Sequence, residues 1–151
     1  MKALIDRLHR QKCSCVIANG DDVRMFHQRG VADLYDLLRG EPAFLQGARV
    51  ADKVVGKGAA ALMVAGGVAE LYADTLSRRA MDLLETHGVS VDCAQVVSGI
   101  RNRAGTGWCP VETLCASLTD IGEMVEAIGR FLAAQQKSSS HAVITETTNT
   151  Q

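Results

Sequence analysis

The sequence has no excess of charge of either sign and no long hydrophobic run. It contains 16 lysines and arginines against 17 aspartates and glutamates, a formal net charge of -1. This balance gives no electrostatic attraction to nucleic acids or anionic membranes. No apolar stretch reaches the roughly 18 to 20 residues of a membrane-spanning helix, and charges interrupt residues 1–8, unlike a signal peptide. We therefore expect a cytoplasmic protein with no nucleic-acid or membrane partner.

The common catalytic and cofactor-binding motifs are absent in complete form. Gly105-Thr106-Gly107 lacks the Gly-Lys-Ser/Thr of a nucleotide phosphate loop and the third glycine of a dinucleotide fingerprint. Cys109 and Cys115 are six residues apart rather than three, and no His-x-Glu element precedes them, so the sequence does not predict a zinc site. The odd number of five cysteines, without a secretion signal, favours reduced thiols. We expect no metal and no cofactor.

Length and composition predict one globular domain followed by a polar tail. A chain of 151 residues fits one domain and can bury roughly 68 to 70% of its extended-chain surface. The hydrophobic share of 47% and the charged share of 22% are typical of globular proteins. From about residue 136 the composition turns to Ser, Thr, Asn and Gln. We predict a folded domain over residues 1–135 and a disordered tail over residues 136–151.

Helix and strand signals alternate along the chain. Asn19-Gly20 predicts the tight turn of a β-hairpin between residues 13–18 and 22–27. Ser77 is a predicted helix cap, and Asp120 with Glu123 forms a predicted capping box at the start of the last helix. Further short strands are predicted at residues 48–51, 68–73 and 89–93, with helices between them. Together these elements predict a single-domain α/β protein, a three-layer α/β/α sandwich with a mixed sheet.

Residues 52–66 have the composition of a central helix. Asp52 provides a helix cap, and Gly66-Gly67 provides a stop. Gly56 and Gly58 cost stability in a helix interior, and close approach of another backbone is the usual compensation. One interpretation is that the small residues serve helix packing alone. The functional alternative is that Asp52 and Lys53 face a cleft at the start of this helix.

A glycine-bearing loop at residues 101–108 precedes a second predicted helix start at Cys109-Pro110. Free N–H groups at such a loop and the positive end of the helix dipole suit an anion. The predicted ligand-binding residues are Lys53, Asn102, Arg103, Gly105, Thr106 and Gly107. A tight turn alone also explains the glycines.

Cys109 differs from the other cysteines in its predicted position at a helix N-terminus. The helix dipole favours a thiolate there and increases its nucleophilicity. A catalytic Cys109 would use Glu112 or Asp52 as its proton acceptor. The alternative is that Cys109 only caps the helix.

Residues 52–60 and 102–112 together resemble domain of unknown function 1893, an uncharacterised bacterial family with a cytidine deaminase-like fold. The resemblance covers about residues 1–134. It implies that Asp52-Lys53 lies where deaminases start the helix carrying their zinc histidine and glutamate, and that Cys109-Pro110 lies near the start of the helix carrying two zinc cysteines. The sequence has Asp-Lys in place of His-x-Glu and Cys-Pro-Val-Glu in place of Pro-Cys-x-x-Cys. The resemblance therefore implies a deaminase-like domain without the zinc-activated water.

Three hypotheses for the function follow. The first is a metal-free domain that binds a small anionic or nucleotide-like ligand between the two helix N-termini. The second is a cysteine-dependent enzyme or sulfur carrier using Cys109, by analogy with the sulfurtransferase that matures formate dehydrogenase, which the fold resembles. The third is a non-catalytic interaction module, for which homo-oligomerisation is compatible with the sequence.

Overall fold

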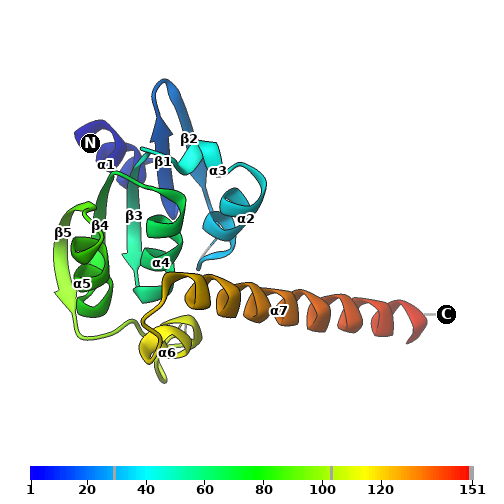
Figure 1. Cartoon of the computed structure of the whole chain (residues 1–151). Coiled ribbons are helices and arrows are strands. Elements are labelled where there is room, and N and C mark those ends of the chain that lie inside the picture. Colours follow the sequence, from blue (N-terminus) through cyan, green and yellow to red (C-terminus); the bar gives the residue numbers. More distant parts are fainter. Residues whose placement is uncertain (29, 103, 150–151) are drawn as a thin grey trace.

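The computed structural model describes residues 1–28, 30–102 and 104–149, with side chains up to residue 136. A five-stranded sheet in the order β2-β1-β3-β4-β5 forms its centre (Figure 1). The central strand β3 runs antiparallel to β1 and parallel to β4, and β5 is parallel to β4. The strands are β1 (Cys15–Asn19), β2 (Asp22–Phe26), β3 (Arg49–Val55), β4 (Glu70–Ser77) and β5 (Ser90–Val97). The prediction of a mixed sheet is confirmed.

Helices connect and cover the strands. They are α1 (Lys2–Arg10), α2 (Ala32–Gly40), α3 (Pro42–Leu45), α4 (Lys57–Gly66), α5 (Arg78–Thr86), α6 (Pro110–Ala116) and α7 (Ile121–Asn149). The crossovers from β3 to β4 and from β4 to β5 each contain one helix, as parallel neighbours require. The protein is a single-domain α/β fold. None of the described helices combines the length and the apolar character needed to cross a bilayer.

The predicted hairpin is confirmed, although its turn is shifted by one residue. Asn19 pairs with Asp22, so the two loop residues are Gly20 and Asp21. Gly20 has a φ of 60° and supplies the positive angle that the turn needs. The Asn19 amide instead donates to the carbonyl oxygens of Phe44 and Gln46, at 2.9 and 2.8 Å. These bonds fix the hairpin to the segment before β3.

The prediction that Asp52 begins the central helix is wrong. Residues 49–55 are a strand, and α4 begins at Lys57 after Gly56, whose φ of -103° and ψ of -177° are extended. The reason is tertiary pairing: β3 is hydrogen-bonded on both sides, and its β-branched Val50, Val54 and Val55 favour a strand. The predicted helix stop is confirmed, because Gly67 adopts the left-handed conformation with a φ of 80°.

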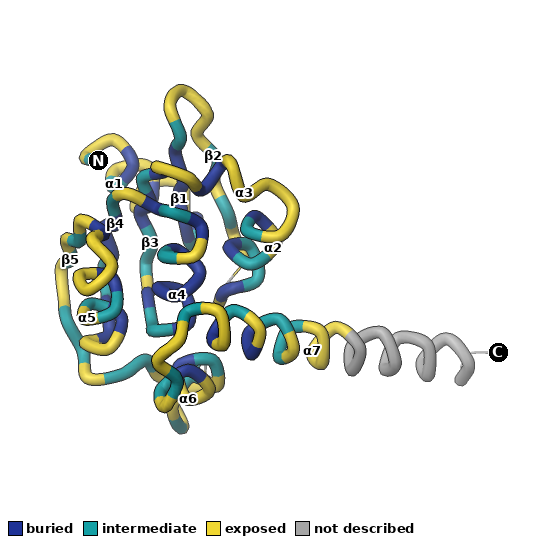
Figure 2. The backbone as a smooth tube through the Cα atoms, viewed as in Figure 1, coloured by how far each residue is buried: buried dark blue, intermediate teal, exposed yellow. Residues whose placement is uncertain are grey.

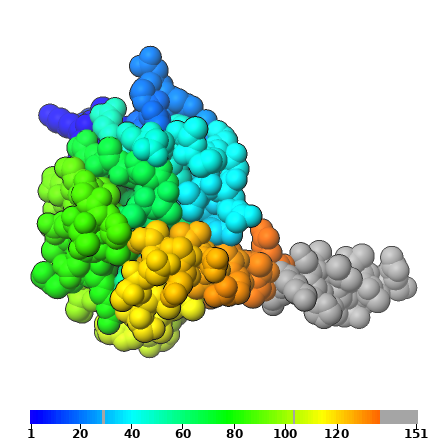
Figure 3. All heavy atoms as spheres, in the orientation of Figure 1, coloured from blue at the N-terminus to red at the C-terminus, as the bar shows by residue number. Residues whose placement is uncertain are grey.

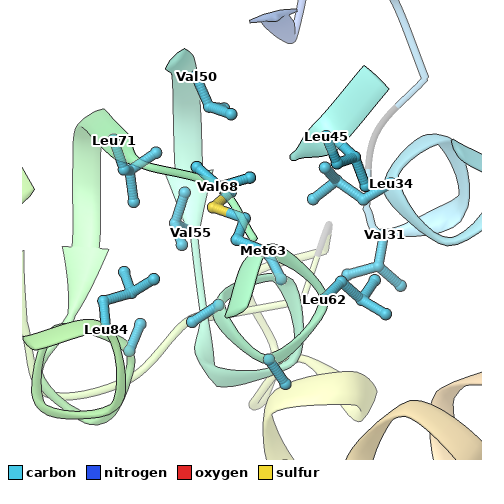
Figure 4. Close-up of a cluster of buried hydrophobic side chains, with 14 of the residues drawn as sticks. Val31, Leu34, Leu45, Val50, Val55, Leu62, Met63, Val68, Leu71 and Leu84 are labelled. Atoms are coloured by element: carbon cyan, nitrogen blue, oxygen red, sulfur yellow. The ribbon is translucent and has the colours of Figure 1, made fainter. Parts of the chain in front are cut away.

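Two apolar clusters lie on the two faces of the sheet. The larger cluster joins Ile17, Val50 and Leu71 to apolar residues of α2, α4, α5 and α7. In Figure 4, Leu62 of α4 lies beside Val31 at the start of α2. The smaller cluster holds Leu4 and Leu8 of α1 against β1, β3 and Tyr72 of β4. Figure 2 shows the buried backbone concentrated in α4 and the strands around it.

Two of the predicted helix caps are confirmed. The Ser77 hydroxyl accepts a hydrogen bond from the Ala80 N–H at 3.1 Å, at the start of α5. The Asp120 carboxylate accepts the Glu123 N–H at 3.0 Å, at the start of α7. That helix continues to Asn149, and the side chains beyond residue 136 lie outside the described part. The division at residue 135 and the disordered tail stay predictions.

Candidate functional site at the carboxyl ends of the parallel strands

The carboxyl ends of the parallel strands lead into the segments in which we predicted a site. Strand β3 passes through Gly56 into α4, and β5 continues through residues 98–109 into α6. Ligands of open α/β sheets bind outside this edge. The edge is also where α6 contacts the first turn of α4.

A glutamate from α6 occupies the start of α4. Glu112 is only 2% exposed, and its Oε2 atom accepts a hydrogen bond from the backbone N–H of Lys57. That N–H is one of the four at a helix start that have no partner within the helix. Oε1 is also buried, and no described residue donates a hydrogen bond to it. The chain thus places its own carboxylate where we predicted an external anion, with one oxygen free to accept a donor.

Two glycines permit the close approach of α6. A Cβ atom added at Gly56 would lie 2.6 Å from Oε2 of Glu112, and one added at Gly58 would lie 2.3 Å from Cγ1 of Val111. Side chains at either position would push the two helices apart. The prediction that these glycines allow a close approach is confirmed, but the neighbours are side chains, mainly of α6, and not the backbone of a sheet.

Lys57 is the lysine that lies beside α6, whereas the predicted lysine was Lys53. The Lys57 Nζ atom donates to the carbonyl oxygens of Ala116 and Leu118, at 3.2 and 2.7 Å. These carbonyls lie at the C-terminal end of α6, where a cation is favoured. Glu112 and Lys57 therefore fasten α4 to both ends of α6. The shift in the start of α4, by five residues from Asp52 to Lys57, is what sequence reasoning missed.

Asp52 and Lys53 lie within β3, away from any helix start. Asp52 pairs with Cys15 of β1 and with Ala73 of β4. Consecutive residues of a strand point to opposite faces, so the two side chains do not share one cleft. The backbone N–H of Lys53 donates to the Ser14 carbonyl oxygen at 3.1 Å. The expectation that both residues face a cleft at a helix N-terminus is therefore wrong.

Asp52 is nevertheless an unusual acid. Burial raises its pKa to about 7, and this effect outweighs the hydrogen bonds from the N–H groups of Val54 and Lys53 and from the Cys15 thiol. Burial also raises the pKa of Cys15 well above its ordinary value, and the nearby Asp52 raises it further. The described partners of Asp52 are in β1, β3 and β4.

The loop at residues 101–108 folds as a small hairpin that uses its own polar groups. The Asn102 N–H donates to the Gly107 carbonyl oxygen at 2.9 Å, and the Asn102 Oδ1 atom accepts the Thr106 N–H at 3.1 Å. The Gly105 N–H donates to the Asn102 carbonyl oxygen at 3.1 Å, and Gly105 has a φ of 70°. The tight-turn interpretation therefore accounts for Asn102, Gly105 and Thr106. Arg103 lies outside the described residues.

Trp108 is a feature of this loop that sequence reasoning missed. It is 51% exposed, and Arg101 stacks over its ring with the guanidinium carbon 4.6 Å from the ring centroid. The indole also lies close to Gly99, since a Cβ atom added there would be 3.0 Å from the ring. Trp108 is the only tryptophan in the sequence, and this was the signal by which it could have been singled out.

Cys109 precedes α6 as predicted. Its N–H donates to the Ile100 carbonyl oxygen at 2.7 Å, which closes the hairpin, and its carbonyl oxygen accepts the Thr113 N–H at 3.0 Å. The proton acceptor that we predicted for it, Glu112, is directed toward Lys57 in α4. Cys115, six residues farther along, is buried, and burial raises its pKa. A catalytic role for Cys109 stays a prediction.

Metal-binding potential can be judged from the side chains that the structure describes. Among residues 1–28, 30–102 and 104–136, no three His, Cys, Asp or Glu residues are grouped so that they could hold a metal ion. At the junction of α4 and α6, the described polar groups are one carboxylate, one ammonium and backbone amides. This set suits hydrogen bonding to an organic ligand.

Comparisons with known proteins give a family and a fold. The family model for a domain of unknown function, DUF1893, matches residues 3–132. No curated protein matches the sequence. The crystal structure of a DUF1893 family protein from Thermotoga maritima is similar, with a TM-score of 0.77 and 21% sequence identity over 84% of this chain and 86% of that one. The likeness shows a shared fold, and the match over most of the sequence shows that this chain belongs to the DUF1893 family.

Proposed function

We propose that this protein is a metal-free domain with cytidine deaminase-like layering that binds a small nucleotide-like molecule between the start of α4 and α6. The contact between these two helices supports the proposal, because the resemblance to deaminases implies that their catalytic groups lie at the corresponding pair of helix starts. In this chain Gly56-Lys57, and not Asp52-Lys53, stands at the first of these starts.

The observation that carries the proposal is the buried Oε1 atom of Glu112. Burying a carboxylate oxygen away from water without a hydrogen-bond donor lowers the stability of the folded protein, by roughly 1 to 3 kcal/mol or more for a charged group. Oε1 has no donor among the described residues, although Oε2 is bonded to the start of α4. A ligand N–H or O–H group that enters between the start of α4 and α6 and reaches this oxygen, which is closed to solvent here, would satisfy it. Structural capping alone requires only Oε2.

The chemistry of Glu112 changes the class of ligand from the one first expected. A carboxylate at the helix start repels an anionic group and accepts hydrogen bonds from N–H donors. The ligand group nearest to α4 is therefore neutral or cationic, such as the amino or ring N–H edge of a nucleobase. An anionic part of the ligand would lie farther from Glu112.

An NMR titration of the full-length protein tests the proposal. Nucleobases, nucleosides and nucleotides are added separately to ¹⁵N-labelled protein, and the backbone amide shifts are followed. We expect saturable shifts that centre on Gly56, Lys57 and Gly58, and also on Val111 and Glu112. The proposal is wrong if no compound of the three classes shifts these amides.

The variant Glu112→Gln links the shifts to the carboxylate. Glutamine keeps the size and an acceptor oxygen but replaces one oxygen with a donor, so we expect at least a tenfold weaker affinity, since a hydrogen bond to a charged group contributes about 1.5 to 3 kcal/mol. Thr113→Ala is the matched control, because Thr113 is an exposed neighbour on α6. Equal affinity of wild type and Glu112→Gln would contradict the proposal. The use of Cys109 as a nucleophile or sulfur carrier, the interaction module and homo-oligomerisation stay predictions.

A further inference from the structure

A shallow hollow lies between α2 and α7, away from the junction of α4 and α6. Its volume is about 320 Å³, and its polar lining comes from Tyr35, Arg39, Glu126 and Arg130, with the backbone of Gly129 between the last two. Figure 3 shows the atoms of α2, in cyan, directly against those of α7, in orange. The size is at the lower end of the range for small-molecule sites, about 300 to 1,000 Å³.

Gly129 places the Tyr35 phenol in this hollow. A Cβ atom at position 129 would lie 2.4 Å from the tyrosine hydroxyl oxygen and 2.9 Å from the ring carbon that carries it. A glycine within a helix is less favourable than alanine, and the room that Gly129 leaves for Tyr35 explains its presence. The hydroxyl is consequently held against Gly129 of α7, in the hollow that Arg130 also lines.

The two arginines of the hollow carry charge that the described residues do not neutralise. Neither Arg39 nor Arg130 has a carboxylate within salt-bridge distance among the described side chains, whereas Arg24 pairs with both Asp22 and Glu41, at 2.9 and 3.0 Å. Glu126 is the only acid in the lining. The hollow therefore has a net positive charge in a protein whose formal net charge is -1.

We propose that this hollow binds the phosphate group of a small molecule, a second site that is independent of the one beside Glu112. Guanidinium groups donate paired hydrogen bonds to phosphate oxygens, and they stay charged at every physiological pH. Two of them, together with the Tyr35 hydroxyl, supply donors for three phosphate oxygens. Glu126 opposes the anion and limits the affinity.

Isothermal titration calorimetry on the full-length protein tests this site with three probes. Inorganic phosphate, glycerol phosphate and citrate are titrated at constant ionic strength, which separates phosphate recognition from attraction to any anion. We expect the two phosphates to bind more tightly than citrate. Binding of glycerol phosphate in preference to inorganic phosphate would identify a phosphomonoester as the ligand, and equal binding would identify the free ion.

Single substitutions assign the binding to this hollow. Arg39→Ala and Arg130→Ala should each weaken phosphate binding by about tenfold or more, since charge-assisted hydrogen bonds are among the strong ones. Tyr35→Phe should weaken it less, and Glu126→Gln should strengthen it. Arg79→Ala is the matched control, because Arg79 is an exposed arginine on α5.

Two outcomes would overturn the proposal. One is phosphate binding that Arg39→Ala and Arg130→Ala leave unchanged. The other is the absence of phosphate binding by the wild type, provided that ¹⁵N spectra also show no shifts at the amides of residues 35–39 and 126–130. Both arginines are exposed, so their variants should fold and the test does not depend on stability.

Discussion

Asp52 is the described residue whose ionisation has the clearest consequence for stability. Its pKa is about 7 in the folded protein, against about 3.9 in an unfolded chain. Between these values the unfolded state has lost a proton that the folded state still holds. The unfolded state therefore binds fewer protons, and stability falls as the pH rises from about 4 to about 7. Below this window both states are protonated, and above it both are ionised.

Asp52→Asn should remove this pH dependence. The amide of the introduced asparagine stays neutral, keeps an oxygen for the Val54 N–H, and avoids the cost of a buried charge, so the variant should be more stable than wild type above about pH 7. The difference should approach about 1.4 kcal/mol for each unit of pKa difference. Urea unfolding from acid to neutral pH measures it, with Asp82→Asn on the exposed face of α5 as control. Parallel pH curves for wild type and Asp52→Asn would contradict the assignment.

At the scale of elements, the contact between α4 and α6 depends on the absence of side chains. Gly58→Ala improves helix propensity by less than the about 1 kcal/mol of a helix interior, since Gly58 is the second residue of α4, and its Cβ would lie 2.3 Å from Cγ1 of Val111. We expect a net destabilisation of about 1 to 3 kcal/mol, the usual cost of overpacking. Gly40→Ala is the control, because nothing lies within 4 Å of an added Cβ there and helix propensity alone should act.

A second substitution shows whether the cost arises from this contact. Val111→Ala removes the methyl group that Gly58→Ala would strike, so the double variant should be more stable than the sum of the two single effects predicts. Chemical denaturation of the four proteins gives the coupling free energy. Additive effects would show that α6 does not constrain the start of α4.

The elements that the sequence predicts well are those with a local physical cause. The hairpin follows from Gly20, whose positive φ no other turn residue supplies, and α5 follows from Ser77, which bonds the third residue of its own helix. The start of α4 depends on β3, which pairs with two distant strands and extends to Val55. Asp52 is therefore a residue type that caps helices, but it lies within a strand. Long-range pairing is not visible in a local pattern.

The candidate site could be predicted only in part for the same reason. Glu112 was named from its place after Pro110, but its bond to Lys57 joins residues 55 positions apart in the sequence. The hollow between α2 and α7 was missed because Tyr35 and Gly129 each resemble an ordinary helix residue until the two helices are brought together. Residue chemistry was therefore accessible from the sequence, and its geometry was not.

At the scale of the whole molecule, the two faces of the sheet differ in how firmly they are covered. One face is held by residues of α2, α4, α5 and α7, whereas α1 contributes only Leu4 and Leu8 as buried residues on the other. Ile5 of α1 packs against this cluster while only partly buried, and the His9 Nε2 atom lies 2.8 Å from an Asp74 carboxylate oxygen that also accepts the Tyr72 hydroxyl. Few buried contacts imply a low free energy of local opening.

Native-state hydrogen exchange should therefore show α1 opening before the rest of the protein. We expect the amides of residues 5–10 to exchange with a lower free energy of opening than those of residues 60–66, because α4 is buried along most of its length. Leu8→Ala, which truncates a fully buried side chain, should cost about 2 to 5 kcal/mol and accelerate exchange in α1 most. Leu62→Ala is the matched substitution on the opposite face and should accelerate exchange throughout the sheet. If Leu8→Ala changes both regions equally, α1 unfolds together with the core, and the smaller cluster is part of a single cooperative unit.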